Sequence, residues 1–435
     1  MKIIQIIPGS GGSFYCSNCL RDATYFNALR GLGHDVVKIP MYLPLFSDDS
    51  DIEDIPIFYG AVSMYLKQLY PIFRYAPKWF DKLLNSKSAL RYAAKKAGST
   101  NATGLEDMTV SMLLGEDGKQ AEDLEFMVNW IDMHFKPDVI HLSNALLLGL
   151  AKRLNHKMNV PIVCSLQDED TWVDVMQPSF RDKVWKLMSE KAADVDAFIS
   201  VSDYYAEVSM QRMKIEKSKI QTLHLGVDPA NYSYKNSSEK SRNIGFISRM
   251  CEFNGLDTLV DAFINIKKLA ENNDVKLIIT GGSTGDDSKF ISKLKKKIGI
   301  SGLLKDVEFY KDFTGQARTD FFDKVAVVSV PVNTGEAFGI YLTEAMACGI
   351  PVVQPPVGAF PEIIAKSGGG IIYDENNADS LSIALNKLIN NNEQLKSLSE
   401  AARKSAEKIF NVNLLAAELI NKYEQIHNQY VPTNQ

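Results

Sequence analysis

The sequence predicts an α/β fold made of two Rossmann-like, doubly wound domains of similar size. Three observations lead to this prediction. Short β-branched runs alternate with helical patterns, the runs are continuously apolar, and a polar stretch at residues 231–242 separates two such series. Alternating strands and helices are typical of parallel sheets with crossover helices. Strands that are apolar throughout fit a sheet covered by helices on both faces.

Eleven runs are predicted to be strands, five before the polar stretch and six after it. They lie at residues 3–7, 36–39, 139–142, 161–166, 197–201, 244–247, 276–280, 307–310, 325–332, 351–354 and 370–372. The segments between them carry apolar residues at helical spacing, as in Leu256, Leu259, Val260 and Phe263. Each strand is therefore expected to lead into a helix that returns over the sheet.

The predicted domains are residues 1–230 and 231–410, followed by a helical segment at 411–435 that crosses back to the first domain. Residues 41–130 do not fit the strand–helix alternation, and we expect a mostly helical insertion there. Ligands of doubly wound sheets bind beyond the carboxyl ends of the strands. Two such domains facing each other would form a cleft with a binding edge on each wall.

Composition excludes several functional classes. The chain has 435 residues, is 45% hydrophobic and 23% charged, and carries a net charge of −5, which argues against general nucleic-acid binding. The first residues read as a strand instead of a signal peptide, and no apolar run approaches the ~18 residues of a membrane span. Five scattered cysteines make a disulfide framework unexpected. We expect a cytoplasmic protein.

Two glutamates follow the predicted strand at 325–332. Glu336 lies in the turn, and Glu344 lies eight residues further along a helix expected over about 338–348. Eight residues make about 2.2 helical turns, so the two carboxylates do not share one tight site. A carboxylate can accept two hydrogen bonds from a vicinal diol, so the pair could hold a sugar and a ribose. The alternative is a structural pair, with Glu336 as a helix cap and Glu344 in solvent.

The beginning of the same helix offers a place for a diphosphate between those two sugars. The amides of Phe338, Gly339 and Ile340 would be unpaired donors at the positive end of the helix. Glycine at 339 lets a phosphate approach the backbone closely.

Residues 325–362, which include EAFGIYLTE at 336–344, GIPVV at 349–353 and GAFPE at 358–362, resemble the donor site of family 4 retaining glycosyltransferases. That family has the GT-B fold of two Rossmann domains. The resemblance extends more weakly to LGHDV at 32–36, PDVIH at 137–141, LGVD at 225–228 and ISR at 247–249. It fails across 41–130.

The resemblance implies specific roles. Glu336 would contact the transferred sugar, Glu344 the ribose hydroxyls, and Arg249 the diphosphate. It further implies transfer with retention of anomeric configuration from a nucleotide diphosphate-sugar to a hydroxyl acceptor, without a metal or other cofactor. We take Glu336 and Arg249 as the candidate catalytic residues.

The sequence departs from the family pattern at two places. Asn254 stands where the family usually has a lysine that also neutralises the diphosphate, and asparagine brings no charge. Gln167 follows a strand where many relatives have a histidine near the sugar, and it could still bond a sugar hydroxyl. Gln167, Asp168, Asp22 and His141 are our candidates for the acceptor and sugar side. His141, like His34, could equally be a core histidine.

Two further patterns suggest a metal, and neither is specific. Asp168-Glu169-Asp170 matches an Asp-x-Asp pattern, but so do two other places in the chain. Cys16 and Cys19 have the spacing of half a zinc site or a redox pair, yet no second pair completes it, which favours two free thiols. No metal is expected. Gly11 and Gly12 in the same loop could close the backbone over the diphosphate.

Residues 65–96 carry eight basic side chains interleaved with aromatic ones. This composition suits a peripheral contact with an anionic membrane surface, and so a lipid-linked acceptor. It equally suits a helix with one core face, or a platform on which an acceptor sugar stacks.

The sequence therefore predicts a glycosyltransferase whose acceptor is a glycan, glycolipid or small molecule. Two other functions stay open. Asn254 favours a catalytically weak or silent nucleotide-sugar binding protein or scaffold subunit, and the same fold could serve a nucleotide-sugar epimerase. A nicotinamide enzyme is disfavoured because the first loop lacks the dinucleotide fingerprint.

Overall fold

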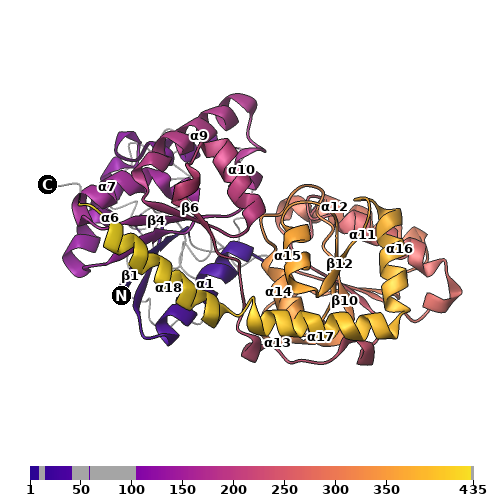
Figure 1. Ribbon diagram of the computed structural model, residues 1–435. Helices are drawn as coiled ribbons and strands as arrows, with labels where there is room; N and C mark the ends of the chain where they lie inside the picture. The colour runs from indigo at the N-terminus through magenta and orange to yellow at the C-terminus, as the bar shows by residue number, and fades with distance from the viewer. Residues whose placement is uncertain (9–14, 42–57, 59–103, 433–435) are drawn as a thin grey trace. The chain divides into compact units, whose positions relative to one another are not determined.

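The computed structural model describes residues 1–8, 15–41, 58 and 104–432 (Figure 1). The chain divides into two compact units. Unit 1 comprises Met1–Gly12, Tyr25–Leu223 and Ala416–Gln435, and unit 2 comprises Ser13–Thr24 and His224–Leu415. Two helices, α1 (Ser17–Gly31) and α18 (Val412–Gln429), each contain one of these limits.

Unit 1 contains a parallel six-stranded sheet with the strand order β2-β1-β3-β4-β5-β6. Its strands are β1 (Lys2–Ile7), β2 (Asp35–Pro40), β3 (Val139–Leu142), β4 (Ile162–Leu166), β5 (Ala197–Ser200) and β6 (Ile220–Thr222). Its other helices are α5 (Glu106–Leu114), α6 (Ala121–His134), α7 (Ala151–Met158), α8 (Glu169–Val173), α9 (Pro178–Lys191) and α10 (Asp203–Met213).

Unit 2 contains a second parallel six-stranded sheet with the order β12-β11-β10-β7-β8-β9. The strands are β7 (Ile244–Ile247), β8 (Leu277–Thr280), β9 (Val307–Phe309), β10 (Val327–Val328), β11 (Val352–Gln354) and β12 (Gly370–Ile372). The helices are α11 (Leu256–Lys267), α12 (Ser288–Ile300), α13 (Gly315–Lys324), α14 (Ile340–Ala347), α15 (Phe360–Ser367), α16 (Ala378–Ile389) and α17 (Asn392–Lys408).

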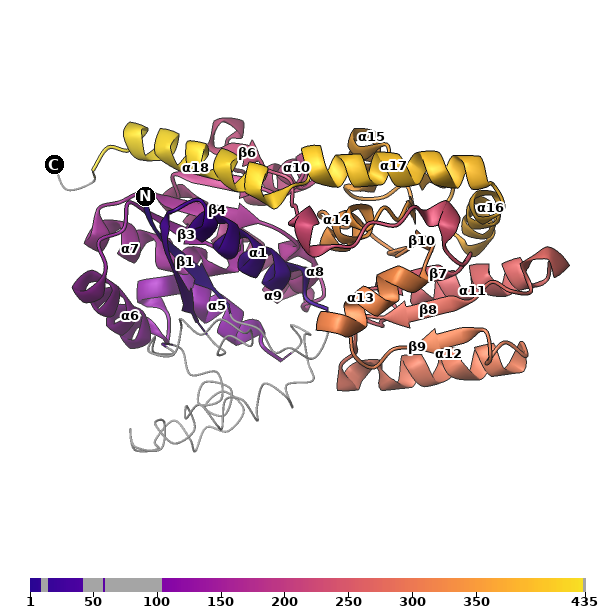
Figure 2. The ribbon, with the colours of Figure 1, turned by 90° about the horizontal axis from the view of Figure 1, so that it is seen from below.

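The strand order of unit 2 places its helices on two faces. The chain moves outward from β7 to β9 and then returns to β10, and right-handed crossovers put α11 and α12 on one face and α14 and α15 on the other. Helix α16 packs on α11, and α17 packs on α14 and α15. Figure 2 shows α17 running along the side of the sheet that carries α14 and α15. Both sheets are therefore doubly wound, as predicted.

The predicted strands agree with the observed ones, with two differences. The run at 325–332 forms only the two-residue strand β10, although Val327, Val328, Val330 and Val332 are all buried. Burial beside the strand, without ladder pairing, explains the apolar pattern there. The strand β6, whose residues are only half-buried, lies at the sheet edge and has no apolar run to predict it.

The division into units falls at Leu223/His224 and at Leu415/Ala416, whereas we predicted domain limits at residues 230/231 and 410/411. The predicted limits stay predictions. Most of the predicted insertion at 41–130 lies outside the described residues. Its described part contains α5 and α6.

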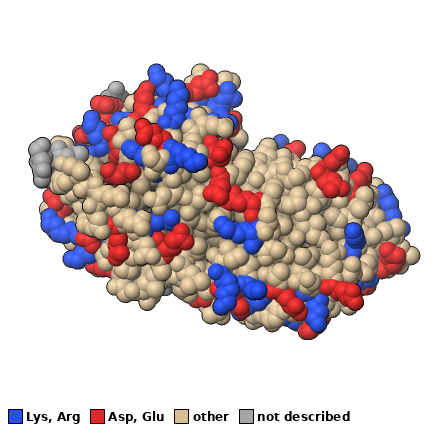
Figure 3. All heavy atoms as spheres, viewed as in Figure 1, with Lys and Arg blue, Asp and Glu red and all other residues tan. Residues whose placement is uncertain are grey.

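Among the described residues, no helix is long and apolar enough to cross a membrane. On the face drawn in Figure 3, acidic and basic side chains are interspersed, and neither sign covers a large continuous area.

Candidate donor site

Two loops meet at the carboxyl edge of the unit 2 sheet. One follows β7 and the other follows β10, the neighbouring strand. The amide of Asn333 donates to the carbonyl of Phe253 over 3.0 Å, and its side chain donates to the carbonyl of Glu252 over 2.8 Å. At Gly255, where φ is +68°, a Cβ would lie 1.7 Å from the carbonyl oxygen of Pro331, so only glycine fits. The loops that carry Arg249 and Glu336 are thus joined backbone to backbone.

Glu336 is half-buried in the second of these loops. The Tyr341 hydroxyl donates to its carboxylate over 3.3 Å. The loop after β11 packs on its backbone, because the Ala359 amide donates to the Glu336 carbonyl over 3.0 Å. Gly358, with φ +60°, makes this packing possible, since a Cβ there would lie 2.4 Å from the Glu336 nitrogen. The position of Glu336 is therefore fixed by the GAFPE segment.

Helix α14 begins at Ile340, two residues later than predicted. Gly339 precedes it with φ +78°, in the left-handed region that glycine tolerates best. Phe338 and Ile340 have fully buried side chains on either side of this turn. Binding of a diphosphate by the amides of residues 338–340 stays a prediction.

Glu344 is fully buried, so the alternative of a solvent-exposed carboxylate on the helix is wrong. Three side chains donate to it. The Tyr232 hydroxyl and the Arg318 Nη1 reach Oε1 over 2.8 and 3.0 Å, and the Tyr15 hydroxyl reaches Oε2. We refer to Tyr15, Tyr232 and Arg318 as the Glu344 clamp.

Charge and burial set the protonation of the clamp. The neighbouring Glu344 carboxylate raises the pKa of Arg318, so this guanidinium stays charged. Burial, and then the charge of Glu344, raise the pKa of Tyr15 and of Tyr232 well above the usual value for tyrosine. Both hydroxyls are therefore protonated and act as donors to the Glu344 carboxylate.

Arg249 follows β7 and forms a bidentate ion pair with Asp287. Its Nε and Nη2 lie 2.9 and 3.0 Å from the two carboxylate oxygens, and Nη2 also bonds the Thr284 hydroxyl. Burial alone would raise the pKa of Asp287, but the hydrogen bonds from Arg249 and Thr284 outweigh it and the pKa lies below the usual range. The residue predicted to neutralise a diphosphate thus already has an anionic partner.

Asn254 bonds its own loop. Its side-chain nitrogen donates to the Ser248 hydroxyl and to the Arg249 carbonyl, both over 2.9 Å. The asparagine therefore shapes the turn that presents Arg249.

Two of the four candidates for the acceptor and sugar side, Gln167 and Asp168, lie at the carboxyl end of β4 in unit 1. Gln167 is buried, and Asp168 has the strained φ of +59° that a non-glycine residue seldom adopts. Glu169 accepts from the amides of Ala145 and Gln167, each over 2.9 Å, and Asp170 accepts from the Tyr205 hydroxyl over 2.9 Å. Two of the three acidic residues therefore hold the turn in place.

His141 lies in β3 and connects three elements of unit 1. Its Nδ1 contacts the Tyr423 hydroxyl of α18, and its Nε2 lies 2.8 Å from the Ser165 hydroxyl of β4. These contacts fit a buried structural histidine. Asp22, in α1, pairs with Arg21 over 2.8 Å. Roles for His141 and Asp22 at the acceptor stay predictions.

The expectation of two free thiols at Cys16 and Cys19 is wrong, because the structure joins them in a disulfide. The two residues lie three apart at the beginning of α1, and their Cα atoms are 5.3 Å apart, a separation typical of disulfides. Cys164, Cys251 and Cys348 are not part of this disulfide.

Some predicted features lie outside the described residues, namely Gly11, Gly12 and the basic, aromatic stretch at 65–96. In the part of the chain that is described, no group of three or more His, Cys, Asp or Glu residues is arranged to hold a metal ion.

Sequence reasoning missed most of the residues that contact Glu336 and Glu344, the two glutamates predicted to bind the donor. Tyr15, Tyr232 and Arg318 lie 329, 112 and 26 residues from Glu344 in the chain. No local pattern connects residues so far apart. Tyr341 could have been found, since it lies within the motif, five residues after Glu336.

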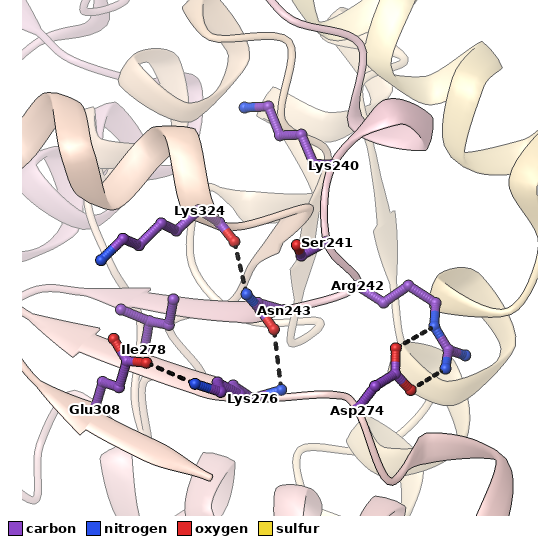
Figure 4. A pocket seen from close by; sticks show the side chains of 9 residues that line it. All are labelled: Lys240, Ser241, Arg242, Asn243, Asp274, Lys276, Ile278, Glu308 and Lys324. Carbon is purple, nitrogen blue, oxygen red and sulfur yellow. Dashed lines mark hydrogen bonds and ion pairs between the residues drawn. The ribbon is translucent and has the colours of Figure 1, made fainter.

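A cavity of about 470 Å³ lies at the opposite, amino edge of the unit 2 sheet (Figure 4). Asn243 and Lys276 line it just before β7 and β8 begin. Arg242 pairs with Asp274, and Lys276 pairs with Glu308 over 3.1 Å. The cavity contains none of the predicted donor-binding residues, so we do not assign the donor to it. Its lining is Lys240, Ser241, Arg242, Asn243, Asp274, Lys276, Ile278, Glu308 and Lys324.

Two family models match the chain. Residues 231–405 match the glycosyl transferases group 1, and residues 119–231 match glycosyltransferase family 4. The first match contains Arg249, Asn254, Glu336 and Glu344.

Relatives among characterised proteins are distant. The spore coat protein SA of Bacillus subtilis is 24% identical over 262 residues, which are 56% of this chain and 69% of that protein. A D-inositol 3-phosphate glycosyltransferase of Stackebrandtia nassauensis is 26% identical over 211 residues, 45% of this chain and 47% of that protein.

Solved structures resemble the whole fold. HepE of Anabaena in complex with UDP aligns with a TM-score of 0.68 at 16% identity, covering 98% of this chain and 100% of its own. Sucrose-phosphate synthase of Thermosynechococcus elongatus aligns with a TM-score of 0.72 at 15% identity over the same shares. These likenesses show the GT-B fold, and the two family matches, which together cover residues 119–405, identify the chain as a glycosyltransferase of the group 1 and family 4 type.

Proposed function

We propose that this enzyme transfers a sugar from a nucleotide diphosphate-sugar to a hydroxyl acceptor, with retention of configuration and without a metal. The observation that carries the proposal is the connected set of side chains in unit 2. Tyr341 bonds Glu336 and packs edge-on against Tyr15, with ring centroids 6.4 Å apart, and Tyr15 bonds Glu344. These contacts support one site that contains both glutamates.

Each end of the site suits one part of such a donor. The Glu344 carboxylate suits the ribose diol, and the more exposed Glu336 suits hydroxyls of the sugar. Arg249, on the loop joined to that of Glu336, suits the diphosphate, which a guanidinium can bind through two parallel hydrogen bonds. Asn254 acts indirectly by shaping the Arg249 turn.

The chemistry asked of these residues is mainly charge stabilisation. The bond from the anomeric carbon to the diphosphate breaks, a bond to the acceptor oxygen forms, and the acceptor proton leaves with the nucleoside diphosphate. Arg249 and the amides at the beginning of α14 would stabilise the negative charge that develops on the leaving group. This is the work that a divalent cation does in other transferases.

The named complexes of the structural neighbours suggest the first probes. HepE has been crystallised with UDP and with UDP-glucose. We therefore propose a uridine diphosphate-sugar as the first donor to test, with GDP- and ADP-sugars beside it. The acceptor is proposed to be a hydroxyl of a glycan, a glycolipid or a small molecule.

Thermal unfolding across this panel tests donor binding. A ligand present at roughly 100 times its dissociation constant should add about 2.7 kcal/mol to the free energy of unfolding. A panel in which no nucleotide sugar raises the melting temperature contradicts the proposal.

Glu336→Ala tests the assignment of the sugar contact. The variant should lose sugar transfer while still binding the nucleoside diphosphate, because Glu344 and Arg249 are intact. Transfer is measured as the release of UDP from UDP-glucose in the presence of a mixture of acceptor sugars. Full activity of the variant would remove Glu336 from the mechanism.

Two other functions make different predictions. A silent binding protein would bind donors but release no nucleoside diphosphate, and Asn254→Lys would not restore turnover. An epimerase would convert the donor into its isomer in the absence of any acceptor, which chromatography of the nucleotide sugars detects.

A further inference from the structure

The Glu344 carboxylate leaves little room for a ligand. A carboxylate offers about four acceptor positions, two on each oxygen. Tyr232 and Arg318 take two positions on Oε1, and Tyr15 takes one on Oε2. Glu344 is also fully shielded from solvent. A ribose that donates two hydrogen bonds to this carboxylate must therefore displace at least one member of the clamp.

The three clamp residues differ in how they are attached to unit 2. Tyr232 and Arg318 belong to its main stretch, His224–Leu415, and Arg318 extends from helix α13. Tyr15 belongs to the short separate stretch Ser13–Thr24. Its amide donates to the Gly281 carbonyl over 2.7 Å.

The Tyr15 ring contacts both Arg318 and Tyr341. The Arg318 guanidinium, whose side chain is 22% exposed, lies 5.8 Å from the centre of the Tyr15 ring. The ring also meets Tyr341 edge-on, with ring centroids 6.4 Å apart, and Tyr341 bonds Glu336. A ligand that spans the two glutamates must pass the position of the Tyr15 ring.

We propose that the Tyr15 hydroxyl occupies the ribose position on Glu344 and is exchanged for a ribose hydroxyl when the donor binds, while Tyr232 and Arg318 are positioning residues that keep the carboxylate oriented. The inference rests on the proposed function, since it concerns the ribose end of the same site. It adds that the Tyr15 hydroxyl and the donor ribose compete for the Glu344 carboxylate. The enzyme's affinity for the donor is therefore lower than it would be without this hydroxyl.

Two tyrosine-to-phenylalanine variants at one carboxylate test this directly. Tyr15→Phe removes the competing hydroxyl, keeps the ring, and should bind UDP about 10-fold more tightly, the factor expected for one hydrogen bond to a charged group. Tyr232→Phe removes a hydroxyl that orients Oε1 and should bind UDP several-fold more weakly. Calorimetric titration measures both, and circular dichroism verifies that both variants are folded.

A comparison of UDP with 2′-deoxy-UDP locates the effect. The deoxy nucleotide lacks one of the two ribose donors, so the gain from Tyr15→Phe should be smaller for it than for UDP. An equal gain with both nucleotides would place the effect away from the ribose and overturn the inference. So would UDP affinities that fall in both variants, the result expected if Tyr15 is purely structural.

The inference and the proposed function fail in different ways. If the unmodified enzyme binds UDP and Tyr15→Phe does not tighten it, the inference fails and the proposed function stands. If the unmodified enzyme binds none of UDP, GDP or ADP but Tyr15→Phe binds one of them, the inference that the Tyr15 hydroxyl occupies the ribose position is supported. If neither protein binds any of the three, both proposals fail.

Discussion

Two arginine–carboxylate pairs in unit 2 are buried to almost the same extent. They differ in which partner, the arginine or the carboxylate, is predicted to bind the donor. Arg249 and Arg318 are both 22% exposed, and their partners Asp287 and Glu344 are 7% and 0% exposed. In the first pair the motif identifies the arginine, and in the second it identifies the carboxylate. These two predicted contacts of the donor, Arg249 and Glu344, are thus already paired with residues that the motif does not include.

The two pairs differ in which hydrogen bonds and charges remain on the partner when a ligand binds to Arg249 or to Glu344. If Arg249 turns to a diphosphate, Asp287 still accepts from the Thr284 amide and hydroxyl, over 2.7 and 2.9 Å. If Glu344 lost Arg318, a fully buried carboxylate would lose its countercharge. We infer that the Arg249–Asp287 pair opens when a diphosphate binds, and that the Arg318–Glu344 pair stays intact.

The largest expected effect comes from breaking the pair that stays. Arg318→Leu should lower the free energy of unfolding by about 3 kcal/mol, because removing one partner of a buried ion pair leaves an uncompensated charge. Urea denaturation followed by circular dichroism measures it.

The double variant Arg318→Leu/Glu344→Gln serves as its control. Without the carboxylate charge, most of the lost stability should return. A double variant that is less stable than Arg318→Leu would show that the arginine contributes through packing instead of charge.

The next effect concerns the pair that opens. Arg249→Met should weaken UDP binding by roughly 10- to 100-fold, the equivalent of one charge-assisted contact of about 1.5–3 kcal/mol, and should leave uridine binding almost unchanged. Arg242→Met is the matched control, since Arg242 lies at the amino edge of the same sheet and is also paired with an aspartate. Equal losses for UDP and uridine would contradict a diphosphate contact.

A smaller effect should follow from the turn that carries Arg249. Asn254→Ala removes two hydrogen bonds of 2.9 Å, each of them worth about 1 kcal/mol, so the turn should loosen. We expect UDP affinity to fall several-fold and stability to fall by about 1–2 kcal/mol, both measured as above. If stability fell and UDP affinity did not change, the turn at Asn254 would have no part in donor binding.

The same two pairs show how far the sequence could be read. The apolar runs predicted every strand except the half-buried edge strand β6, and they overestimated β10 because buried residues beside a strand look like strand residues. The motif pointed to Glu336, Glu344 and Arg249 through local order. It could not reveal Arg318 or Asp287, because a pairing across the fold leaves no periodicity in the chain. Asn254 was interpreted as a lost charge, whereas in the structure its amide bonds two acceptors in its own loop.

The smallest expected effect is a dependence on pH that comes from the pair that opens. The hydrogen bonds from Arg249 and Thr284 outweigh burial and hold the pKa of Asp287 below its usual 3.8. A carboxyl group whose pKa is lower in the folded state stabilises the fold above its unfolded pKa, and that contribution disappears as the pH falls through the folded value. Asp287→Asn lacks the carboxylate, so its difference in unfolding free energy from the unmodified enzyme should be constant from pH 7 to pH 5. It should shrink below about pH 4, by no more than about 1 kcal/mol for a pair whose arginine is partly in solvent. Urea titrations of both proteins at pH 7, 5, 4 and 3 measure it, and a difference that does not change down to pH 3 would mean that Asp287 gains nothing from Arg249 and that the arginine is already free to meet a diphosphate.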